Sequence, residues 1–361
     1  MADFEVAIIG AGIAGAGLAA EIGPHRRTII LEAEDQPGYH STGRSAAFWS
    51  ETYGGPAIQP LTSASGPVLR ADGHLLSLGA VQIGLEEHRA KAEAFIRDFA
   101  GAVELTAIDP ATRIPGLQPQ WVVGVDEGSC AYIDVAGVLA VALGRARKAD
   151  VDIRTRSRLT SARREGGLWH LDTPSGSLTA NVLVNAAGAW ADEVARVAGA
   201  QPQNIQPYRR TIVQLRMAQP LPPALPHVSD FGGTFYFKPE GEDRIWLCPH
   251  DETPVEAHDV APEELDVAIA IDRFEHVVDW RIAAVERKWA GLRSFASDRR
   301  PVYGYAPDRE GFFWCAGQGG FGIQTAPAAA AMAAALLLDA PPADFVAHID
   351  TAPFRPNRAE A

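Results

Sequence analysis

A glycine-rich turn between two apolar runs constrains the fold more than any other feature of the sequence. Residues 10–15 read GAGIAG and follow a β-branched run at 4–9, while Glu32 closes a second such run at 27–31. The first glycine allows a tight turn, the second lets a pyrophosphate approach the backbone, and the third lets a helix pack on the strand. Glu32 would end the next strand, where its carboxylate can accept both hydroxyls of an adenosine ribose. The motif alone is weak evidence, but with its flanking strand, helix and acid it predicts a dinucleotide site.

Length and charge bound the class of protein. The chain has 361 residues, which is long for one core and predicts about two domains. With 47% hydrophobic and 21% charged residues, the composition is that of an ordinary soluble globular protein. The formal net charge of −13 argues against nucleic acid or an anionic membrane surface as a partner, because phosphate contacts need clustered Lys and Arg. An anionic substrate must therefore be held by a few local arginines.

The cysteines and the apolar segments point to the cytoplasm. Cys130, Cys248 and Cys315 are far apart and odd in number, so neither a disulfide framework nor a metal site is expected. The N-terminus lacks a basic region and is used by the glycine motif, so we expect no signal peptide. The longest apolar stretch, 326–338, is too short to cross a bilayer, and no transmembrane segment is expected.

Apolar spacing and turn signals predict an α/β chain that passes between two regions. A strand is expected at 80–84, a helix at 85–100, and a second helix from the N-cap Asp134 to about residue 148. Residues 181–188 read as a buried strand that turns into a helix through small residues. A proline-rich stretch at 201–226 indicates a crossing between domains.

The second half of the chain favours antiparallel sheet and then a return to the first region. Expected strands are 211–217, 234–238, 244–248, 285–295, 301–305 and 311–316, with helices at 262–280 and from about 326 to 339. We therefore predict a Rossmann-like nucleotide-binding domain with an inserted α+β substrate domain built on antiparallel sheet. The predicted nucleotide-binding domain comprises residues 1–53, 131–200 and 290–361, and the predicted substrate domain comprises 54–130 and 201–289.

A second glycine-rich loop near the C-terminus changes the expected cofactor from NAD to FAD. Residues 316–325 read AGQGGFGIQT and lie between a predicted strand and a predicted helix. The glycines let backbone approach a flat ligand, and the N-terminus of the following helix favours the negative charge of a reduced flavin. Two such loops at opposite ends of the chain suit the long FAD molecule. The alternative is that residues 319–322 form only a tight turn.

Several motifs together resemble one family. They are GYHSTGRSAA at 38–47, VNAAGAW at 184–190, WAGLRSF at 289–295 and GQGGFGIQT at 317–325. In this order, after the GAGIAG turn and Glu32, they resemble the FAD-dependent D-amino-acid oxidase superfamily, and within it bacterial D-arginine dehydrogenase and related D-amino-acid dehydrogenases. The resemblance implies non-covalent FAD and oxidation of a D-amino acid to the imino acid, which water hydrolyses to a 2-oxo acid and ammonia.

The resemblance assigns the substrate carboxylate to two arginines. Arg210 and Arg293 match the arginines that hold it, and the planar guanidinium fork suits a carboxylate. Any single arginine is more often a surface ion pair, but the apolar neighbours of Arg293 argue against that interpretation. Arg210 stands beside Arg209, and only one of the two needs to point inward.

Other site residues follow from the same resemblance. Tyr53 and Tyr236 would line the pocket, with core packing as the alternative, while Gly320 would offer its carbonyl to the amine and Gln324 would face the flavin. The implied cofactor-binding residues are Gly10, Gly12, Ile13, Ala14, Gly15, Glu32, Ala33, His40, Ser41, Thr42, Arg44, Ser45, Ala46, Ala47, Leu159, Ala187, Gly188, Trp190, Gly319, Gly320, Phe321, Gly322, Ile323 and Gln324.

Two departures from the D-arginine dehydrogenase pattern bear on the substrate. Phe48 stands where that enzyme has a histidine, and Val81 stands where it has a glutamate for the substrate guanidinium. A cationic side chain beside Phe48 and Val81 would be desolvated without a partner, at a cost of several kcal/mol. We therefore expect a preference for D-amino acids with uncharged, apolar or aromatic side chains. His227 falls in a loop that borders the pocket or is only structural.

Two other functions stay open at this stage. The same architecture supports an oxidase of glycine, sarcosine or another secondary amine, and a non-catalytic flavin-binding protein is a third interpretation. In the expected reaction the arginines fix the carboxylate so that hydride leaves Cα for flavin N5, and Tyr53 or a water takes the ammonium proton. The sequence does not decide whether a quinone or O2 reoxidises the flavin.

Overall fold

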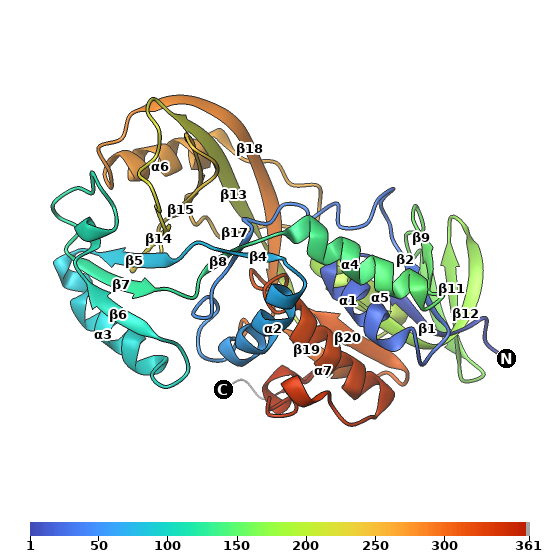
Figure 1. Cartoon of the computed structure of the whole chain (residues 1–361). Coiled ribbons are helices and arrows are strands. Elements are labelled where there is room, and N and C mark those ends of the chain that lie inside the picture. Colours follow the sequence, from blue (N-terminus) through green and yellow to red (C-terminus); the bar gives the residue numbers. More distant parts are fainter. Residues whose placement is uncertain (359–361) are drawn as a thin grey trace.

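The computed structural model describes residues 1–358 and contains two large β-sheets linked by a long pair of strands (Figure 1). One sheet and its helices form the right-hand side of Figure 1, and the other sheet forms the left-hand side. A small third sheet pairs β8 (Ala131–Ile133) with β3 (Phe48–Trp49) and β4 (Leu75–Ser77). It lies near the centre of the molecule.

The first large sheet is the parallel α/β sheet that the GAGIAG turn predicts. Its parallel strands, in spatial order, are β20 (Phe312–Ala316), β12 (Gly176–Asn185), β1 (Phe4–Ile9), β2 (Thr28–Leu31) and β9 (Asp152–Arg154). Antiparallel strands extend it: β19 (Val302–Tyr305) lies beside β20, β11 (Leu168–Thr173) lies beside the first half of β12, and β10 (Ser161–Glu165) lies beside β11. The loops that follow β1, β2, β12 and β20 therefore meet at one edge of the sheet.

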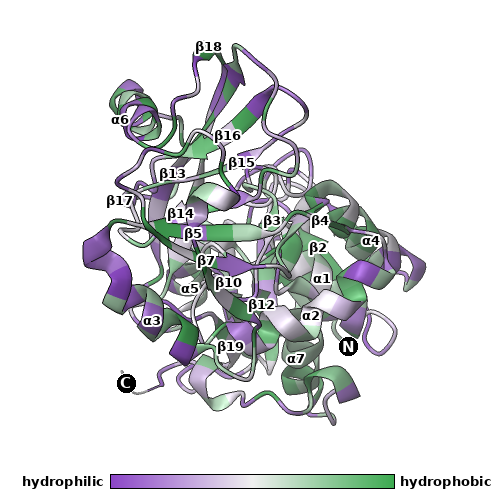
Figure 2. Ribbon diagram, turned by 60° about the vertical axis from the view of Figure 1, so that its left-hand side comes forward, coloured by the Kyte–Doolittle hydropathy of each residue, from purple (hydrophilic) through white to green (hydrophobic). Residues whose placement is uncertain are grey.

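Both faces of this sheet are buried, because β1 is apolar on both sides. Ile8 packs in a core with α1 (Ile13–Ile22), α4 (Val135–Lys148) and α7 (Ala326–Leu338). Ile9 packs in the opposite core with α5 (Ala191–Ala198) and the antiparallel extension. In Figure 2, α7 is green along most of its length, as expected for a helix buried almost all round. The predicted N-cap of α4 is confirmed, since the Asp134 side chain accepts a hydrogen bond from the N–H of Gly137 at 2.9 Å.

One helix was not expected from the sequence. α2 (Gln59–Ala71) contains Pro67 and packs against α7. The Ser65 hydroxyl, buried in this contact, donates to the Leu61 carbonyl and accepts from the N–H of Ala328. The first part of segment 54–130, predicted to belong to the substrate domain, thus packs on a helix of the nucleotide-binding side.

The second large sheet is mostly antiparallel. In spatial order its strands are β17 (Thr253–Pro254), β13 (Gln206–Met217), β16 (Arg244–Cys248), β15 (Tyr236–Pro239), β14 (His227–Asp230), β5 (Ala80–Gly84), β7 (Val123–Glu127) and β6 (Leu105–Ile108), with β18 (Ile282–Phe295) also paired with β13. Only the β14–β5 pair is parallel. α6 (Glu264–Glu275) packs on one face of this sheet, and α3 (Arg89–Asp98) packs beside β7. The predicted antiparallel insertion is thus present, and α6 is shorter than the helix expected at 262–280.

The pair β13–β18 connects the two halves of the molecule. Pairing runs from Met217 opposite Ile282 to Gln206 opposite Phe295, and Figure 1 shows β18 as a long curved strand that reaches the centre. β13 occupies somewhat less than half of the stretch at 201–226 that the sequence marks as a crossing. Its central end carries Arg210 opposite Gly291, two positions from the pair of Tyr208 with Arg293. Both predicted carboxylate anchors are therefore neighbours at the centre of the molecule.

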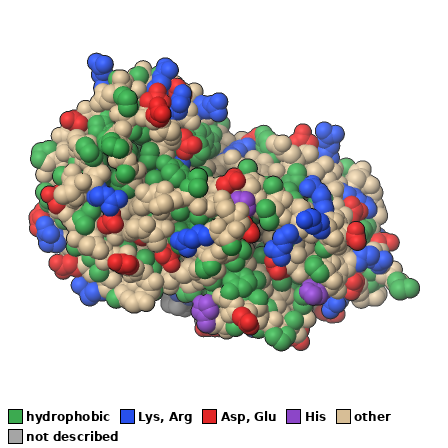
Figure 3. Space-filling view, viewed as in Figure 1, with side chains coloured by type: hydrophobic (Ala, Val, Ile, Leu, Met, Phe, Trp, Pro, Cys, Tyr) green, Lys and Arg blue, Asp and Glu red, His purple; other side chains and the backbone are tan. Residues whose placement is uncertain are grey.

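The remaining elements are single turns of 3-10 helix: η1 (Glu86–His88), η2 (Pro110–Thr112), η3 (Gly188–Trp190), η4 (Asp344–Val346) and η5 (Ala352–Phe354). Within residues 1–358, none of the helices combines the length and apolar character needed to traverse a bilayer. Acidic and basic side chains are interspersed over much of the face seen in Figure 3, and several basic side chains lie close together on its right-hand half.

Candidate active site

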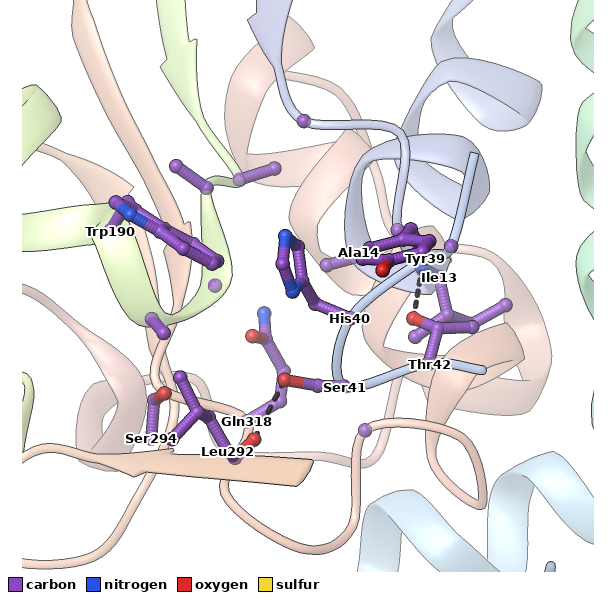
Figure 4. Close-up of a pocket in the computed structure, with 18 of the residues that line it drawn as sticks. Ile13, Ala14, Tyr39, His40, Ser41, Thr42, Trp190, Leu292, Ser294 and Gln318 are labelled. Carbon is purple, nitrogen blue, oxygen red and sulfur yellow. Dashed lines mark hydrogen bonds between the residues drawn. The ribbon is translucent and has the colours of Figure 1, made fainter. Parts of the chain in front are cut away.

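A long cavity runs along the edge of the parallel sheet. It encloses about 1520 Å³, including space continuous with solvent, and is lined by residues from seven separate segments. These are 9–14, 31–45, 158–159, 186–197, 210–212, 291–294 and 318–323. Figure 4 shows side chains from several of these segments converging on the cavity, where the rings of Trp190 and His40 lie next to each other with their centroids 4.5 Å apart. Both glycine-rich loops therefore contribute to one elongated site, as expected if a single long FAD molecule contacts both of them.

Most of the predicted cofactor-binding residues line this cavity. They are Gly10, Gly12, Ile13, Ala14, Glu32, Ala33, His40, Ser41, Thr42, Arg44, Ser45, Leu159, Ala187, Gly188, Trp190, Gly319, Gly320, Gly322 and Ile323. The predicted residues that lie outside its lining are Gly15, Ala46, Ala47, Phe321 and Gln324. Sequence reasoning missed Ile9, Leu31, Glu34, Gly38, Tyr39, Arg158, Ala186, Ala189, Glu193, Val194, Val197, Ile212, Gly291, Leu292, Ser294 and Gln318. Several missed residues, such as Leu292 and Ser294, stand inside motifs already quoted for the resemblance.

The first glycine-rich turn leaves room for a phosphate at the start of α1. Gly10 has φ +103°, and a Cβ there would lie 2.5 Å from the Ala186 carbonyl oxygen. Gly12 caps α1 without a side-chain hydrogen bond, and the N–H of Ile13 donates to the Thr42 hydroxyl at 3.1 Å. A helix N-terminus of this kind binds phosphate through backbone N–H groups. The third glycine serves packing, since a Cβ on Gly15 would lie 2.0 Å from the Gly10 carbonyl oxygen.

Glu32 stands at the end of β2, where a ribose would lie. Its Oε2 accepts from the N–H of Ala11 at 2.6 Å and its Oε1 from the N–H of Glu34 at 2.9 Å. These bonds fix the carboxylate in the cavity wall. The arrangement fits the predicted contact with an adenosine ribose.

Arg44 lines the cavity, but its guanidinium is engaged elsewhere. It donates to the Asp259 carboxylate and to the carbonyl oxygens of Val260 and Ala290. Tyr39 also donates to Asp259 at 3.0 Å. The predicted contact of Arg44 with FAD would therefore be made by its backbone or stem, because its charge ties residues 259–260 to the cavity rim.

The second glycine-rich loop closes the other end of the cavity. Gly319 has φ +54°, and a Cβ there would lie 2.2 Å from the Phe295 ring. A Cβ on Gly320 would lie 2.1 Å from the Tyr53 hydroxyl oxygen. α7 begins only at Ala326, which does not line the cavity. The loop itself, rather than the first turn of α7, therefore provides the surface for a flat ring.

Arg293 lies beside this loop and faces the cavity. Its Nη1 donates to the Tyr53 hydroxyl at 2.6 Å and its Nη2 donates to the Tyr236 hydroxyl at 3.0 Å. No carboxylate within residues 1–358 forms an ion pair with it. Because a guanidinium stays charged, this group is a ready anchor for an anionic ligand.

Arg210 is the second cation at this end of the cavity. Its side chain is 3% exposed, and its Nη2 donates to Glu252 at 2.7 Å. Within the described residues its Nε and Nη1 have no hydrogen-bond partner. The neighbouring Arg209 is neutralised by Asp266 and other acids and does not line the cavity. The structure thus identifies Arg210 as the inward-pointing arginine of the pair.

Four aromatic side chains form a cluster beside Arg293, which contacts two of them, Tyr53 and Tyr236. The ring of Phe48 lies 5.2 Å from that of Tyr53, 5.7 Å from that of Tyr236 and 4.4 Å from that of His227. The His227 and Tyr236 rings stack with their centroids 5.5 Å apart. We call Phe48, Tyr53, Tyr236 and His227 the aromatic cluster. The sequence-predicted residues of the pocket, Val81 excepted, come together here, but none of the four belongs to the lining of the cavity, which includes Arg293.

The expectation for Val81 is wrong. Val81 is fully buried opposite Val228, and both pack with Phe237 in the core beneath α6. His227 and Tyr236 stand at neighbouring positions of β14 and β15 and point to the other face of the sheet. A one-residue difference in alignment reverses the face that a strand residue occupies, which explains the error.

Lys238 lies on the same face of the sheet as His227. Its ammonium donates to Glu240 and lies over the rings of Trp246 and Tyr132, at 4.2 Å and 4.6 Å from their centroids. Burial lowers the pKa of Lys238 and, with the nearby Lys238 charge, lowers the pKa of His227 to about 3. His227 is therefore a neutral imidazole in the folded protein at physiological pH.

Gln324 and Glu127 position the segment that carries Tyr53. The Gln324 amide donates to the Tyr53 carbonyl at 3.0 Å and to the Thr62 hydroxyl at 2.8 Å. Its side chain was expected to face the flavin, but it points away from the cavity instead. Buried Glu127 accepts from the hydroxyls of Ser50 and Thr52 and from the N–H of Glu51. Glu127 carried no sequence signal, because three of its four hydrogen-bond donors lie 75 to 77 residues away. No metal-binding cluster of His, Cys, Asp or Glu occurs in the described chain.

Replacing Gly10 with alanine should remove the flavin. The Cβ would meet the Ala186 carbonyl and strain a backbone with positive φ, which would displace the turn at the phosphate site. We expect Gly10→Ala to purify without the visible absorbance of a flavin. The control Gly144→Ala lies in α4, where a Cβ has open space, and should keep the flavin. Full flavin occupancy in Gly10→Ala would contradict the assigned phosphate site.

Burial of neutral His227 should make the protein less stable at acid pH. In the unfolded chain the His227 imidazole gains a proton near pH 6.5, whereas in the folded chain this imidazole stays neutral down to about pH 3. The unfolded state therefore binds more protons between these values, and stability falls as the pH is lowered. Between pH 7 and pH 5, urea denaturation should show that the native chain loses about 2 kcal/mol more than His227→Phe. Equal losses would show that His227 is not buried in neutral form.

One family model and several known proteins match the sequence of this chain. The family described as "DAO: FAD dependent oxidoreductase" matches residues 5–336. Glycine oxidase of Geobacillus kaustophilus (strain HTA426) is 25% identical over 348 residues, which cover 90% of each chain. Glycerol-3-phosphate dehydrogenase of Pseudomonas aeruginosa is 26% identical over 230 residues, 58% of this chain and 44% of that protein. Human mitochondrial dimethylglycine dehydrogenase is 34% identical over 116 residues, 31% of this chain and 13% of that protein. The chain thus spans less than half the length of the last two relatives.

Solved structures share the whole architecture. The crystal structure of glycine oxidase from Geobacillus kaustophilus has a TM-score of 0.85 and 21% sequence identity, with all of both chains covered. L-proline dehydrogenase from P. horikoshii has a TM-score of 0.83 and 20% identity over 95% of each chain. At these identities the likeness concerns the fold. With the family match over most of the sequence and a cavity built from both glycine-rich loops, the chain belongs to the FAD dependent oxidoreductase family, and FAD is its cofactor.

Proposed function

We propose that the protein oxidises a D-amino acid with an uncharged side chain to the imino acid, which water hydrolyses to a 2-oxo acid and ammonia. The observation that carries the proposal is the guanidinium of Arg293, which faces the cavity between two tyrosine hydroxyls with no ion-paired carboxylate in the described chain. Non-covalently bound FAD would supply the chemistry by accepting a hydride from Cα. A quinone or O2 would then take up the electrons.

The arginines would hold the substrate carboxylate. Arg293 presents a planar fork, and Arg210 offers two buried nitrogens that lack a hydrogen-bond partner within residues 1–358. Tyr53 and Tyr236 accept hydrogen bonds from Arg293, so their own O–H groups remain available as donors to the carboxylate. A carboxylate fixed in this way orients Cα, and such positioning supplies much of a rate enhancement. Gly320, beside Tyr53, would offer its carbonyl to the amine, and we propose Tyr53 or a water as the acceptor of the ammonium proton.

The surroundings of the aromatic cluster favour an uncharged substrate side chain. Arg210 and Arg293 carry positive charge at this end of the cavity. A cationic side chain would be desolvated beside these charges. The expected exclusion of D-Arg and D-Lys therefore has a different cause from the one first inferred, because Val81 lies outside the site.

Oxidation of glycine, sarcosine or another secondary amine is the second candidate. It is favoured by the similarity to a glycine oxidase over 90% of both chains. These substrates carry the same carboxylate and would use the same arginines. They differ in needing no space for a side chain on Cα. A flavin protein without turnover is the third possibility, and it predicts that no amine bleaches the flavin.

A substrate screen tests the proposal. Anaerobic flavin reduction should be measured with D- and L-amino acids, glycine, sarcosine and glycerol 3-phosphate. We expect uncharged D-amino acids to give the highest kcat/KM, with D-Arg and D-Lys at least about 10-fold lower, since an unpaired buried charge costs several kcal/mol. Highest values for glycine or sarcosine would establish the second candidate. Absence of bleaching by every compound would contradict both enzymatic functions.

The Arg293→Lys variant tests the carboxylate anchor. Lysine keeps the charge but loses the fork, and we expect kcat/KM to fall by about 30-fold to 5000-fold, which corresponds to about 2–5 kcal/mol for a disrupted buried charge pair. The matched control is Arg287→Lys at an exposed position of the same strand, β18, which should leave kcat/KM unchanged. A fall of less than about 3-fold in Arg293→Lys would contradict a role of Arg293 in substrate binding. Such a fall corresponds to less than about 0.7 kcal/mol, since each factor of ten is 1.36 kcal/mol.

A further inference from the structure

Arg210, which lines the cavity, shares its acid with a second arginine. Within residues 1–358, Glu252 is the one carboxylate that forms an ion pair with Arg210. The Glu252 Oε1 accepts from Nη2 of Arg210 and from Nη2 of Arg299, each at 2.7 Å. Arg299 is half-exposed and lies over the ring of Phe295, 3.9 Å from its centroid. The neighbouring Arg209 has three acids instead. The charge of Arg210 is therefore compensated only in part.

The backbone on both sides of Glu252 is fixed to β13. Asp251 accepts from the N–H of Thr211 at 2.7 Å and from its hydroxyl at 2.9 Å. Thr253 pairs with Arg209, where β17 runs antiparallel to β13. These two attachments flank Arg210 on β13 and hold Glu252 beside it. The backbone thus sets the position of the acid.

Glu252 acts on a ligand by its charge, because it does not belong to the cavity lining. Burial acts to raise the pKa of Glu252, but Arg299 and Arg210 favour its ionised form, and the pKa is lowered overall. The side chain is therefore a carboxylate at neutral pH. A single ligand carboxylate meets Arg293, which has no ion-paired acid in the described chain, and the remaining charge of Arg210. A second carboxylate would need the part of the Arg210 charge that Glu252 already offsets.

We propose that Glu252 is a specificity-determining residue that acts through Arg210 and restricts the cavity to ligands with a single carboxylate. This inference rests on the proposed oxidation of a D-amino acid with an uncharged side chain, and it names the residue that excludes acidic side chains. With Glu252 ionised, a second carboxylate is desolvated without a free counter-charge. Without the Glu252 charge, Arg210 and Arg293 together match two carboxylates.

Two ligand pairs of nearly equal shape isolate the effect of the second charge. Succinamate and succinate carry no amine, and their Kd values can be measured from changes in the flavin absorbance of the holoenzyme. D-Asn and D-Asp form the matching substrate pair for anaerobic flavin reduction. In the native protein we expect the ligand with one carboxylate to be preferred at least about 3-fold in both pairs, because the second carboxylate lies near a like charge.

The Glu252→Gln variant keeps the shape of the side chain and removes its charge. Both ratios should shift about 10-fold towards the dicarboxylate, with a lower Kd for succinate. A merely structural role predicts weaker binding of both ligands, never tighter binding of one. Glu252→Asp retains the charge and should keep the native preference. The matched control is Glu286→Gln, since Glu286 is also shared by two arginines, Arg216 and Arg244, but at the far end of β18. It should leave both ratios unchanged.

The outcomes separate this inference from the proposed function. If succinate binds the native protein as tightly as succinamate, or if Glu252→Gln leaves the ratios unchanged, the role of Glu252 is overturned while oxidation of D-amino acids stands. If no D-amino acid reduces the flavin, the proposed function fails, and the Kd values of succinamate and succinate still decide whether Glu252 limits the binding of a second carboxylate. The native ratio of these Kd values keeps the inference testable even if Glu252→Gln does not fold.

Discussion

The antiparallel pairing of β13 with β18 is the constraint on which the rest of the structure depends. These two strands belong to the second sheet at one end and reach the edge of the parallel sheet at the other. Their register sets Arg210 and Arg293 two positions apart on neighbouring strands, beside the second glycine-rich loop. A slip of one residue between the strands would turn one of the two guanidinium groups to the opposite face, so that they would no longer share a site. The cofactor cavity and the substrate anchor are therefore built from one backbone arrangement.

The charges at this end of the cavity are arranged for a ligand that supplies an anion. Buried cations normally have a paired acid, because desolvation of an isolated charge costs several kcal/mol. Arg209 and Lys238 follow this rule, with Asp266 and Glu240 as partners. Arg293 instead has two phenol hydroxyls, and Arg210 has a single acid, Glu252, that Arg299 shares. A bound carboxylate would provide the missing counter-charge.

Much of the nucleotide-binding half could be predicted from the sequence, because its signals are local. The GAGIAG turn, the acid that ends β2 and the N-cap Asp134 each lie within a few residues of the element they define. The helix α2 could not be predicted, since Pro67 lowers its helix propensity and its stability comes from burial against α7. The other features that could not be predicted depend on contacts between residues that are far apart in the sequence. The face of Val81 depends on its pairing with Val228, and the partners of Glu127 lie on a distant loop.

The most direct measurement is a crystal structure of the protein with FAD and benzoate, a carboxylate that cannot be oxidised at a C–N bond. The account predicts FAD along the cavity from Gly10 to Gly320, with the benzoate carboxylate on the Arg293 guanidinium between the hydroxyls of Tyr53 and Tyr236. A flavin ring far from Gly320, or a carboxylate bound away from both Arg293 and Arg210, would contradict it.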